Sequence, residues 1–275
     1  MVNSPASRPT IGVFDSGFGG LTVLKELVAL IPNADYLYFG DTARLPYGSK
    51  SVETVARYAV EATHFLEAQG ATLLVIACNT ATALALDQIA RAAHVPVVGV
   101  VEPGAEQAAA ASKNHRVVVI GTEATVSSHA YLKALQRRGI EGREKACPLL
   151  VPLVEEGWVE HPVTEQVAQI YLEDAFGDGF HSADVLVLGC THYPLIKPLL
   201  CRVAPPHVSI VDSAHSTAHA VAEKIKKLAR KTTDDTRREP TLRFFATDSV
   251  EKFRRLGATF LGRAVDAVEH IDLKE

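Results

Sequence analysis

The sequence predicts an α/β protein built around mainly parallel strands. Short runs rich in β-branched residues alternate with longer amphipathic segments, the order expected of a parallel sheet or of two such sheets. Two of these runs, at 73–77 and 184–188, are almost wholly apolar, as are central strands covered on both faces. A chain of 275 residues with 47% hydrophobic residues can bury the core of one large domain or of two smaller ones.

Further elements follow from the same patterns. Strands are predicted at 10–14, 36–40, 73–77, 96–100, 116–120, 149–153, 184–188, 208–212 and 241–245. Between Ser51 and Gly70 apolar residues recur at helical spacing, with a serine near the start and a glycine as a stop signal, so this stretch predicts a helix. The polar run 231–240 predicts a solvated loop.

Charge and composition exclude several classes of partner. The net charge of −4 and the pI near 6.3 give no basic excess, so neither nucleic acid nor a membrane is an expected partner. The first residues lack the basic and apolar parts of a secretory signal, and no apolar run approaches the roughly 20 residues that span a bilayer. We therefore expect a cytoplasmic protein.

The four cysteines lie far apart, at 78, 147, 190 and 201, and form no Cys-x-x-Cys pair. Neither a disulfide framework nor a zinc site is indicated, and free thiols are expected. Two of them stand in matching contexts, because Cys78 lies within LLVIA-CNT at 73–80 and Cys190 within VLVLG-CTH at 185–192.

Either cysteine alone could be an ordinary buried residue, since cysteine is common in protein cores. A polar cluster after an apolar strand costs desolvation unless it binds something, however, and here two such clusters match. The pair therefore favours a catalytic role for Cys78 and Cys190. Cys147 and Cys201 lack this context and are expected to be structural.

Two facing thiols suit one task, which is to remove a proton from one face of a carbon and to return a proton on the other. A thiol with a pKa of about 8.5 is mostly protonated at neutral pH, so one partner must be a thiolate while the other stays a thiol. Asp15, His192 and, from a predicted loop, Glu155 are the candidates for tuning them. Asp15 could instead be a turn or cap residue, and His192 a structural histidine.

Two glycine-containing turns could bind a small anion. DSGFGG at 15–20 lacks the Lys-Ser/Thr end of a phosphate loop and the full G-x-G-x-x-G order, so a nucleotide site is not indicated. Its backbone N–H groups could still bind a carboxylate at the start of a helix. LPYGSK at 45–50 supplies a similar turn with Tyr47 and Gly48 near its centre, although a simple turn explains it equally well.

Taken together, these segments resemble the glutamate racemases, of the aspartate/glutamate racemase superfamily. The resemblance is carried, in family order, by residues 11–24, 39–51, 75–83, 97–104, 119–128, 188–195 and 211–214. One departure lies near the C-terminus, where Ala246-Thr247-Asp248 stands in place of the usual Thr-Gly-Asp.

The resemblance implies two flavodoxin-like α/β domains with mainly parallel sheets and an active site in the cleft between them. The first domain would comprise residues 1–101 and 212–275, and the second residues 102–211. The resemblance also implies a cofactor-independent enzyme, needing neither pyridoxal phosphate nor metal, that interconverts L-glutamate and D-glutamate for peptidoglycan biosynthesis. Members of the family commonly form homodimers.

Residue roles are implied by the same resemblance. Cys78 would abstract the α-proton of D-glutamate and Cys190 that of L-glutamate. The substrate site would be lined by Asp15, Ser16, Tyr47, Gly48, Asn79, Thr80, Thr191 and His192, with help from Thr122 and Thr125 in the second domain. Two rivals stay open: a related two-cysteine enzyme acting on aspartate, a hydantoin or maleate, and a two-lobed protein that binds a dicarboxylate without turnover.

Overall fold

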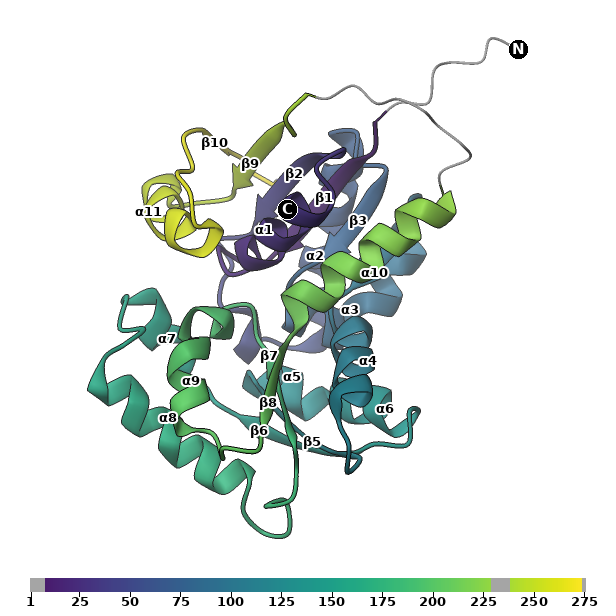
Figure 1. The fold of residues 1–275 in the computed structure, drawn as a ribbon. Helices are drawn as coiled ribbons and strands as arrows, with labels where there is room; N and C mark the ends of the chain where they lie inside the picture. Colours follow the sequence, from purple (N-terminus) through teal and green to yellow (C-terminus); the bar gives the residue numbers. More distant parts are fainter. Residues whose placement is uncertain (1–7, 229–237, 274–275) are drawn as a thin grey trace.

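The computed structural model describes residues 8–228 and 238–273, and its strands form two sheets in which every pair is parallel (Figure 1). The six-stranded sheet has the order β10-β9-β2-β1-β3-β4. Its strands are β1 (Thr10–Asp15), β2 (Asp35–Gly40), β3 (Leu73–Ile76), β4 (Val97–Gly99), β9 (Leu242–Ala246) and β10 (Val268–His270). The four-stranded sheet has the order β6-β5-β7-β8, and comprises β5 (Arg116–Gly121), β6 (Glu141–Ala146), β7 (Val185–Gly189) and β8 (Ser209–Asp212).

Helices connect the strands and cover both sheets, as the alternating pattern predicts. They are α1 (Leu21–Leu30), α2 (Val52–Ala68), α3 (Asn79–Ala92), α4 (Val101–Ala111), α5 (Glu123–Ser128), α6 (Ala130–Gln136), α7 (Leu150–Glu155), α8 (Pro162–Ala175), α9 (Lys197–Val203), α10 (Ser213–Leu228) and α11 (Val250–Leu261), with short 3₁₀ turns η1 (Tyr47–Ser49) and η2 (Tyr193–Ile196). In the described part of the chain, no helix has both the length and the apolar character needed to cross a membrane.

The helix predicted between Ser51 and Gly70 is confirmed as α2. The Ser51 side chain caps it by accepting a hydrogen bond from the Thr54 N–H, and Gly70 follows it with a positive φ of 97°. Of the polar run 231–240, residues 231–237 lie outside the described residues, and 238–240 form no helix or strand.

The strand predicted at 149–153 is wrong, because these residues begin helix α7. A short apolar run cannot be assigned to strand or helix by periodicity alone, and Pro152 is tolerated because it lies in the first turn. Two strands were not predicted, β6 and β10. Both lie at sheet edges, and β6 (EGREKA) is mostly charged, since an edge strand whose side chains are only partly buried needs no apolar pattern.

The strand order explains where ligands can bind. In the six-stranded sheet β1 lies between β2 and β3, and in the other sheet β5 lies between β6 and β7. Each sheet thus has the flavodoxin-like reversal of strand order, at which a crevice opens beyond the carboxyl ends of the strands. The candidate site residues lie at or after the ends of β1, β2, β3, β5 and β7.

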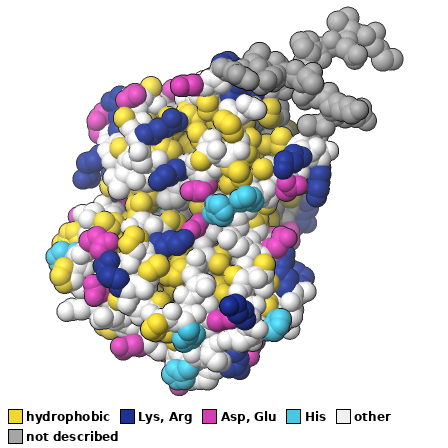
Figure 2. Space-filling model, in the orientation of Figure 1, with side chains coloured by type: hydrophobic (Ala, Val, Ile, Leu, Met, Phe, Trp, Pro, Cys, Tyr) yellow, Lys and Arg dark blue, Asp and Glu magenta, His cyan; other side chains and the backbone are white. Residues whose placement is uncertain are grey.

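The face drawn in Figure 2 carries basic and acidic side chains interspersed, with apolar side chains between them and no continuous basic stripe on that face. Such a mixed surface agrees with the absence of a basic excess in the sequence.

The two sheets approach each other closely at Gly19. A Cβ at this position would lie 2.3 Å from Thr191 Oγ1 and 2.7 Å from the His192 ring, so only glycine fits without displacement. Next to it, Thr22 Oγ1 at the start of α1 donates a hydrogen bond to the Thr191 carbonyl at 3.1 Å. Gly19 and Thr22 follow β1 whereas Thr191 follows β7, and the contact therefore joins the loops of the two sheets.

This close approach predicts that Gly19→Ala destabilises the protein. We expect the free energy of unfolding to fall by about 1–3 kcal/mol, because the added methyl group forces Thr191 and His192 to move. Gly17→Ala is the matched control, since a Cβ there meets only the end of the Leu45 side chain at 3.3 Å and should change stability by about 0.5 kcal/mol or less. Urea unfolding of the two variants measures the difference, and equal stability would contradict this account of the joint.

Candidate active site

A cavity of about 210 Å³ lies between the two sheets and is lined from both. Its size suits a small molecule, since sites for drug-sized ligands usually run from about 300 to 1,000 Å³. The predicted site residues that line it are Ser16, Tyr47, Gly48, Cys78, Asn79, Thr80, Thr122, Cys190, Thr191 and His192, whereas Asp15 and Thr125 do not. The structure thus brings together segments that lie far apart in the sequence.

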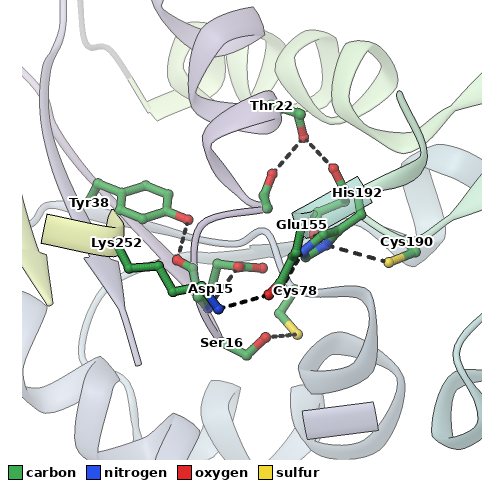
Figure 3. A network of polar contacts seen from close by, with 12 residues as sticks. Asp15, Ser16, Thr22, Tyr38, Cys78, Glu155, Cys190, His192 and Lys252 are labelled. Carbon is green, nitrogen blue, oxygen red and sulfur yellow. Dashed lines mark hydrogen bonds and ion pairs between the residues drawn. The ribbon is translucent and has the colours of Figure 1, made fainter. Parts of the chain in front are cut away.

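Cys78 lies two residues beyond the last residue of β3, between the sheet and α3, where it caps the helix. Its sulfur accepts a hydrogen bond from the Ala81 N–H at 3.4 Å and faces the Ser16 hydroxyl at 3.6 Å (Figure 3). Burial, together with the nearby Asp15, raises the pKa of the Cys78 thiol to about 12. Cys78 is consequently a thiol at neutral pH.

Asp15 lies beside Cys78 but beneath the cavity wall, with 1% of its surface exposed. One carboxyl oxygen accepts from the Gly17 N–H at 2.9 Å, while the other, Oδ1, is buried and has no hydrogen-bond partner. Burial raises the pKa of Asp15 although the charge of His192 opposes the shift. Asp15 therefore lies beside the cavity rather than in its lining, and contributes to the raised pKa of the Cys78 thiol.

Cys190 lies after β7, and its surroundings differ from those of Cys78. His192 Nδ1 is 3.9 Å from the Cys190 sulfur, and His192 Nε2 is 3.2 Å from Glu155 Oε1. Burial would lower the pKa of His192, but Cys190 and Glu155 together raise it to about 10. His192 is therefore an imidazolium at neutral pH, and a cation beside a sulfur is the arrangement that favours a thiolate.

Glu155 links His192 to a further cation. It is the last residue of α7 rather than a loop residue, and its Oε2 lies 3.1 Å from Lys252 Nζ on α11. Burial would raise the pKa of Glu155, but His192 and Lys252 outweigh it and lower that pKa. Glu155 thus stays ionised.

Three threonine hydroxyls meet across the cavity edge. Thr80 Oγ1 lies 3.0 Å from Thr122 Oγ1 and 3.3 Å from Thr125 Oγ1, and the latter two are 2.9 Å apart. Thr122 caps α5 and lines the cavity, whereas Thr125 is fully buried behind it. The cluster joins segments that belong to the two sheets, and Thr80 and Thr122 both line the cavity.

The Tyr47 side chain is held from outside the cavity. Its hydroxyl donates to Asp41 Oδ2 at 2.5 Å, and Asp41 Oδ1 accepts from Thr247 Oγ1 at 2.9 Å. Thr247 also accepts from the Ala43 N–H at 2.9 Å. Thr247, one of the two residues that depart from the usual Thr-Gly-Asp pattern, therefore holds the loop that carries Tyr47.

The Asn79 side chain is also committed to structural contacts, because its Oδ1 accepts from the Tyr131 hydroxyl at 2.7 Å.

Several lining residues were not predicted from the sequence. They are mostly apolar or belong to turns: Gly17, Phe18, Leu45, Pro46, Ser49, Glu123, Pro148, Val151 and Pro152. Val151 and Pro152 lie in the segment that was assigned to a strand. For Leu45 and Pro46 the LPYGSK turn is a usable signal, and Gly17 and Phe18 lie within the DSGFGG turn, which the sequence marks as a possible carboxylate site.

Cys147 and Cys201 lie away from the cavity lining. Cys147 is fully buried and Cys201 is exposed, whereas Cys78 and Cys190 are only 5% and 6% exposed. Among the residues that the structure describes, no group of three or more His, Cys, Asp or Glu side chains is arranged to hold a metal ion.

Comparison with known proteins gives a consistent result. Residues 11–235 match the family described as Asp/Glu/Hydantoin racemase. The chain is 63% identical to a glutamate racemase from Koribacter versatilis, with 97% of this chain and 98% of that protein aligned. It is 48% identical to a glutamate racemase from Syntrophus aciditrophicus, over 98% and 99% of the two chains.

Solved structures agree with the sequence matches. A glutamate racemase isoform from Bacillus anthracis has a TM-score of 0.90 at 35% identity, with 96% of this chain and 98% of that chain covered. The Francisella tularensis glutamate racemase, in complex with D-glutamate, has a TM-score of 0.88 at 36% identity with the same coverage. An aspartate racemase from Picrophilus torridus, at 19% identity and a TM-score of 0.57, shares the fold alone. The chain therefore belongs to the glutamate racemases, within the family of Asp/Glu/Hydantoin racemases.

Proposed function

We propose that this protein interconverts L-glutamate and D-glutamate without a cofactor, using Cys78 and Cys190 as its two acid/base groups. The observation that carries the proposal is the placement of the two thiols. Each follows a central strand of a different sheet, and both line one small cavity. Two independent thiols are what removal of a proton from one face of a carbon and delivery to the other requires.

The similar proteins support glutamate as the substrate rather than aspartate, a hydantoin or maleate. Those that align over nearly the whole chain at 48% and 63% identity are named glutamate racemases, whereas the aspartate racemase shares only the fold. A non-catalytic dicarboxylate-binding protein would need neither of the matched cysteines, nor the cation beside one of them.

The different surroundings of the thiols support a direction for each step. With the cationic His192 at its side, Cys190 as thiolate would take the α-proton of L-glutamate and become a thiol. Cys78, a thiol in the resting protein, would give its proton to the opposite face and become a thiolate, which yields D-glutamate. The reverse reaction begins with the opposite protonation state of both sulfurs.

Hydroxyl groups supply most of the contacts that the substrate carboxylates need. Ser16, Thr80, Thr122 and Thr191 line the cavity from both sheets, and among the described residues that line it none is Lys or Arg. Oriented donors in a water-poor cavity stabilise the charge that develops on a carboxylate as the α-proton leaves.

We further propose the division into residues 1–101 plus 212–275 and residues 102–211. It is supported by strand membership, because the six-stranded sheet draws on 10–99 and 242–270 and the four-stranded sheet on 116–212. A cytoplasmic location, a homodimer and a role in supplying D-glutamate for peptidoglycan rest on the family alone. A sizing column tests the homodimer, and growth of a gene-deleted strain with and without D-glutamate tests the role in peptidoglycan synthesis.

The first prediction concerns the fate of the α-proton in D₂O, with EDTA present and no pyridoxal phosphate added. D-Glutamate formed early from L-glutamate should carry deuterium, because its new proton comes from Cys78, which exchanges with solvent. The remaining L-glutamate should stay largely protiated. Mass spectrometry of the separated enantiomers at low conversion measures both, and mostly unlabelled D-glutamate or equally rapid labelling of the L pool would rule out the two-thiol mechanism.

The second prediction concerns the four cysteines. Cys78→Ser and Cys190→Ser should each lower kcat/KM about 10³-fold, since a positioned acid or base contributes about 10² to 10⁴. The loss should be equal in both directions, because the equilibrium constant between enantiomers fixes the ratio of the two kcat/KM values. Cys147→Ala and Cys201→Ala should remain active, and a folded but inactive form of either would overturn this assignment.

The third prediction concerns pH. Because Glu155 helps to raise the pKa of His192 to about 10, Glu155→Gln should lower that pKa. The imidazolium is present below its pKa and is lost as the pH rises through it, so the alkaline fall in kcat/KM should move to lower pH in the variant. Glu155→Asp, which keeps the charge, is the control. An unchanged alkaline limb in Glu155→Gln would show that His192 does not act as a cation.

A further inference from the structure

The carboxylate of Glu155 is held at both of its oxygens. Oε1 lies 3.2 Å from His192 Nε2, and Oε2 lies 3.1 Å from Lys252 Nζ. Figure 3 shows the resulting line of contacts from Lys252 through Glu155 and His192 to Cys190. A carboxylate bound at one oxygen can rotate, whereas one bound at both oxygens has its plane fixed.

Lys252 comes from a different part of the fold than the residues it orients. It lies on α11, which follows strand β9 of the six-stranded sheet, whereas Glu155 and His192 belong to the segments around the four-stranded sheet. In Figure 1, α11 lies directly above α7. The ion pair thus spans the two halves of the molecule.

We propose that Lys252 is a positioning residue for the Cys190 half of the site. Lys252 holds Glu155 in the orientation that keeps His192 Nε2 occupied and His192 Nδ1 turned toward the Cys190 sulfur. This inference rests on the proposed function, in which Cys190 is one of the two acid/base groups. Lys252 does not line the cavity, so it acts through Glu155 rather than on the substrate.

An exposed ion pair usually contributes only about 0 to 1 kcal/mol to stability, so the importance of this pair depends on how deeply its partners are buried. The Lys252 side chain is 41% exposed, but those of Glu155 and His192 are only 18% and 11% exposed. If the Glu155 carboxylate rotated, the buried His192 ring would lose its hydrogen-bond partner. Leaving a buried polar group without a partner costs free energy.

Helix α11 also contacts His192 directly, through Phe260. The Phe260 ring lies edge-on to the His192 ring, with centroids 5.0 Å apart and an interplanar angle of 78°. Lys252 Nζ also lies 5.3 Å from the centre of the Phe18 ring, which lines the cavity. These contacts fix the placement of α11 against the site, so Lys252 has a defined position from which to hold Glu155.

The kinetic test compares Lys252→Met, Lys252→Arg and Arg255→Met. Lys252→Met should lower kcat about tenfold while KM changes less than about twofold, because geometry at the reacting atoms is lost and the cavity lining is kept. Lys252→Arg should recover most of the activity. Arg255, exposed on the same helix and outside the ion pairs of the described residues, is the matched control and should leave kcat unchanged.

A thiol-reactivity measurement separates positioning from general loosening of the fold. In a Cys201→Ala background, which removes the exposed thiol, iodoacetamide labelling of each cysteine is followed by mass spectrometry of its peptide. Lys252→Met should slow the labelling of Cys190 several-fold, because His192 no longer faces the sulfur. Labelling of Cys78, whose neighbours are Ser16 and Asp15, should not change.

A double variant tests the route through Glu155. If Lys252 acts only on that carboxylate, Lys252→Met should cause no further loss of kcat in a Glu155→Gln protein. Three outcomes overturn the proposal: normal kcat in Lys252→Met, equal slowing of Cys78 and Cys190 labelling, or a further loss in the Glu155→Gln background. A wild-type protein that fails to racemise glutamate contradicts the proposed function instead, and the labelling experiment still tests the link from Lys252 to Cys190.

Discussion

The loop after β1 and the loop after β7 touch at Gly19, where any side chain would collide with Thr191 and His192. This packing constraint sets the distance between the two sheets at the edge where their strands end. The cavity, the threonine cluster and the Lys252–Glu155 contact all require that distance. A site assembled from two rigid halves is only as well ordered as the joint between them.

Across that joint, the two halves of the site differ in charge. Cys78 is surrounded by Asp15, the Ser16 hydroxyl and the first turn of α3, and burial keeps it a thiol. Cys190 faces an imidazolium that is itself held by a carboxylate. Two chemically identical groups are thereby given different electrostatic surroundings, and such differences are a general means by which a protein assigns acid and base roles to a matched pair.

Much of this arrangement could be predicted from the sequence because central parallel strands are continuously apolar and are followed directly by the site residues. The strand prediction at 149–153 was wrong, since a short apolar segment fits a helix as well as a strand. Strand β6 was missed because it is mostly charged and lies at the edge of its sheet, where no apolar pattern is required. The contact between Lys252 and Glu155 could not be predicted at all. It joins residues 97 positions apart and depends on how α11 packs, for which no local pattern exists.

The six-stranded sheet is completed by the last part of the chain. Strand β9 pairs with β2 in the register Tyr36 to Leu242, so the sheet contains neighbours separated by about two hundred residues, with the four-stranded sheet encoded in between. During synthesis the N-terminal segment emerges first and must wait for β9, β10 and α11 before its edge is paired. The residues that line the cavity all lie between 16 and 192, but the contacts that Thr247 and Lys252 make to Asp41 and Glu155 form only when translation is almost finished. A nascent chain stalled before residue 242 would lack these contacts and would expose the unpaired edge of β2.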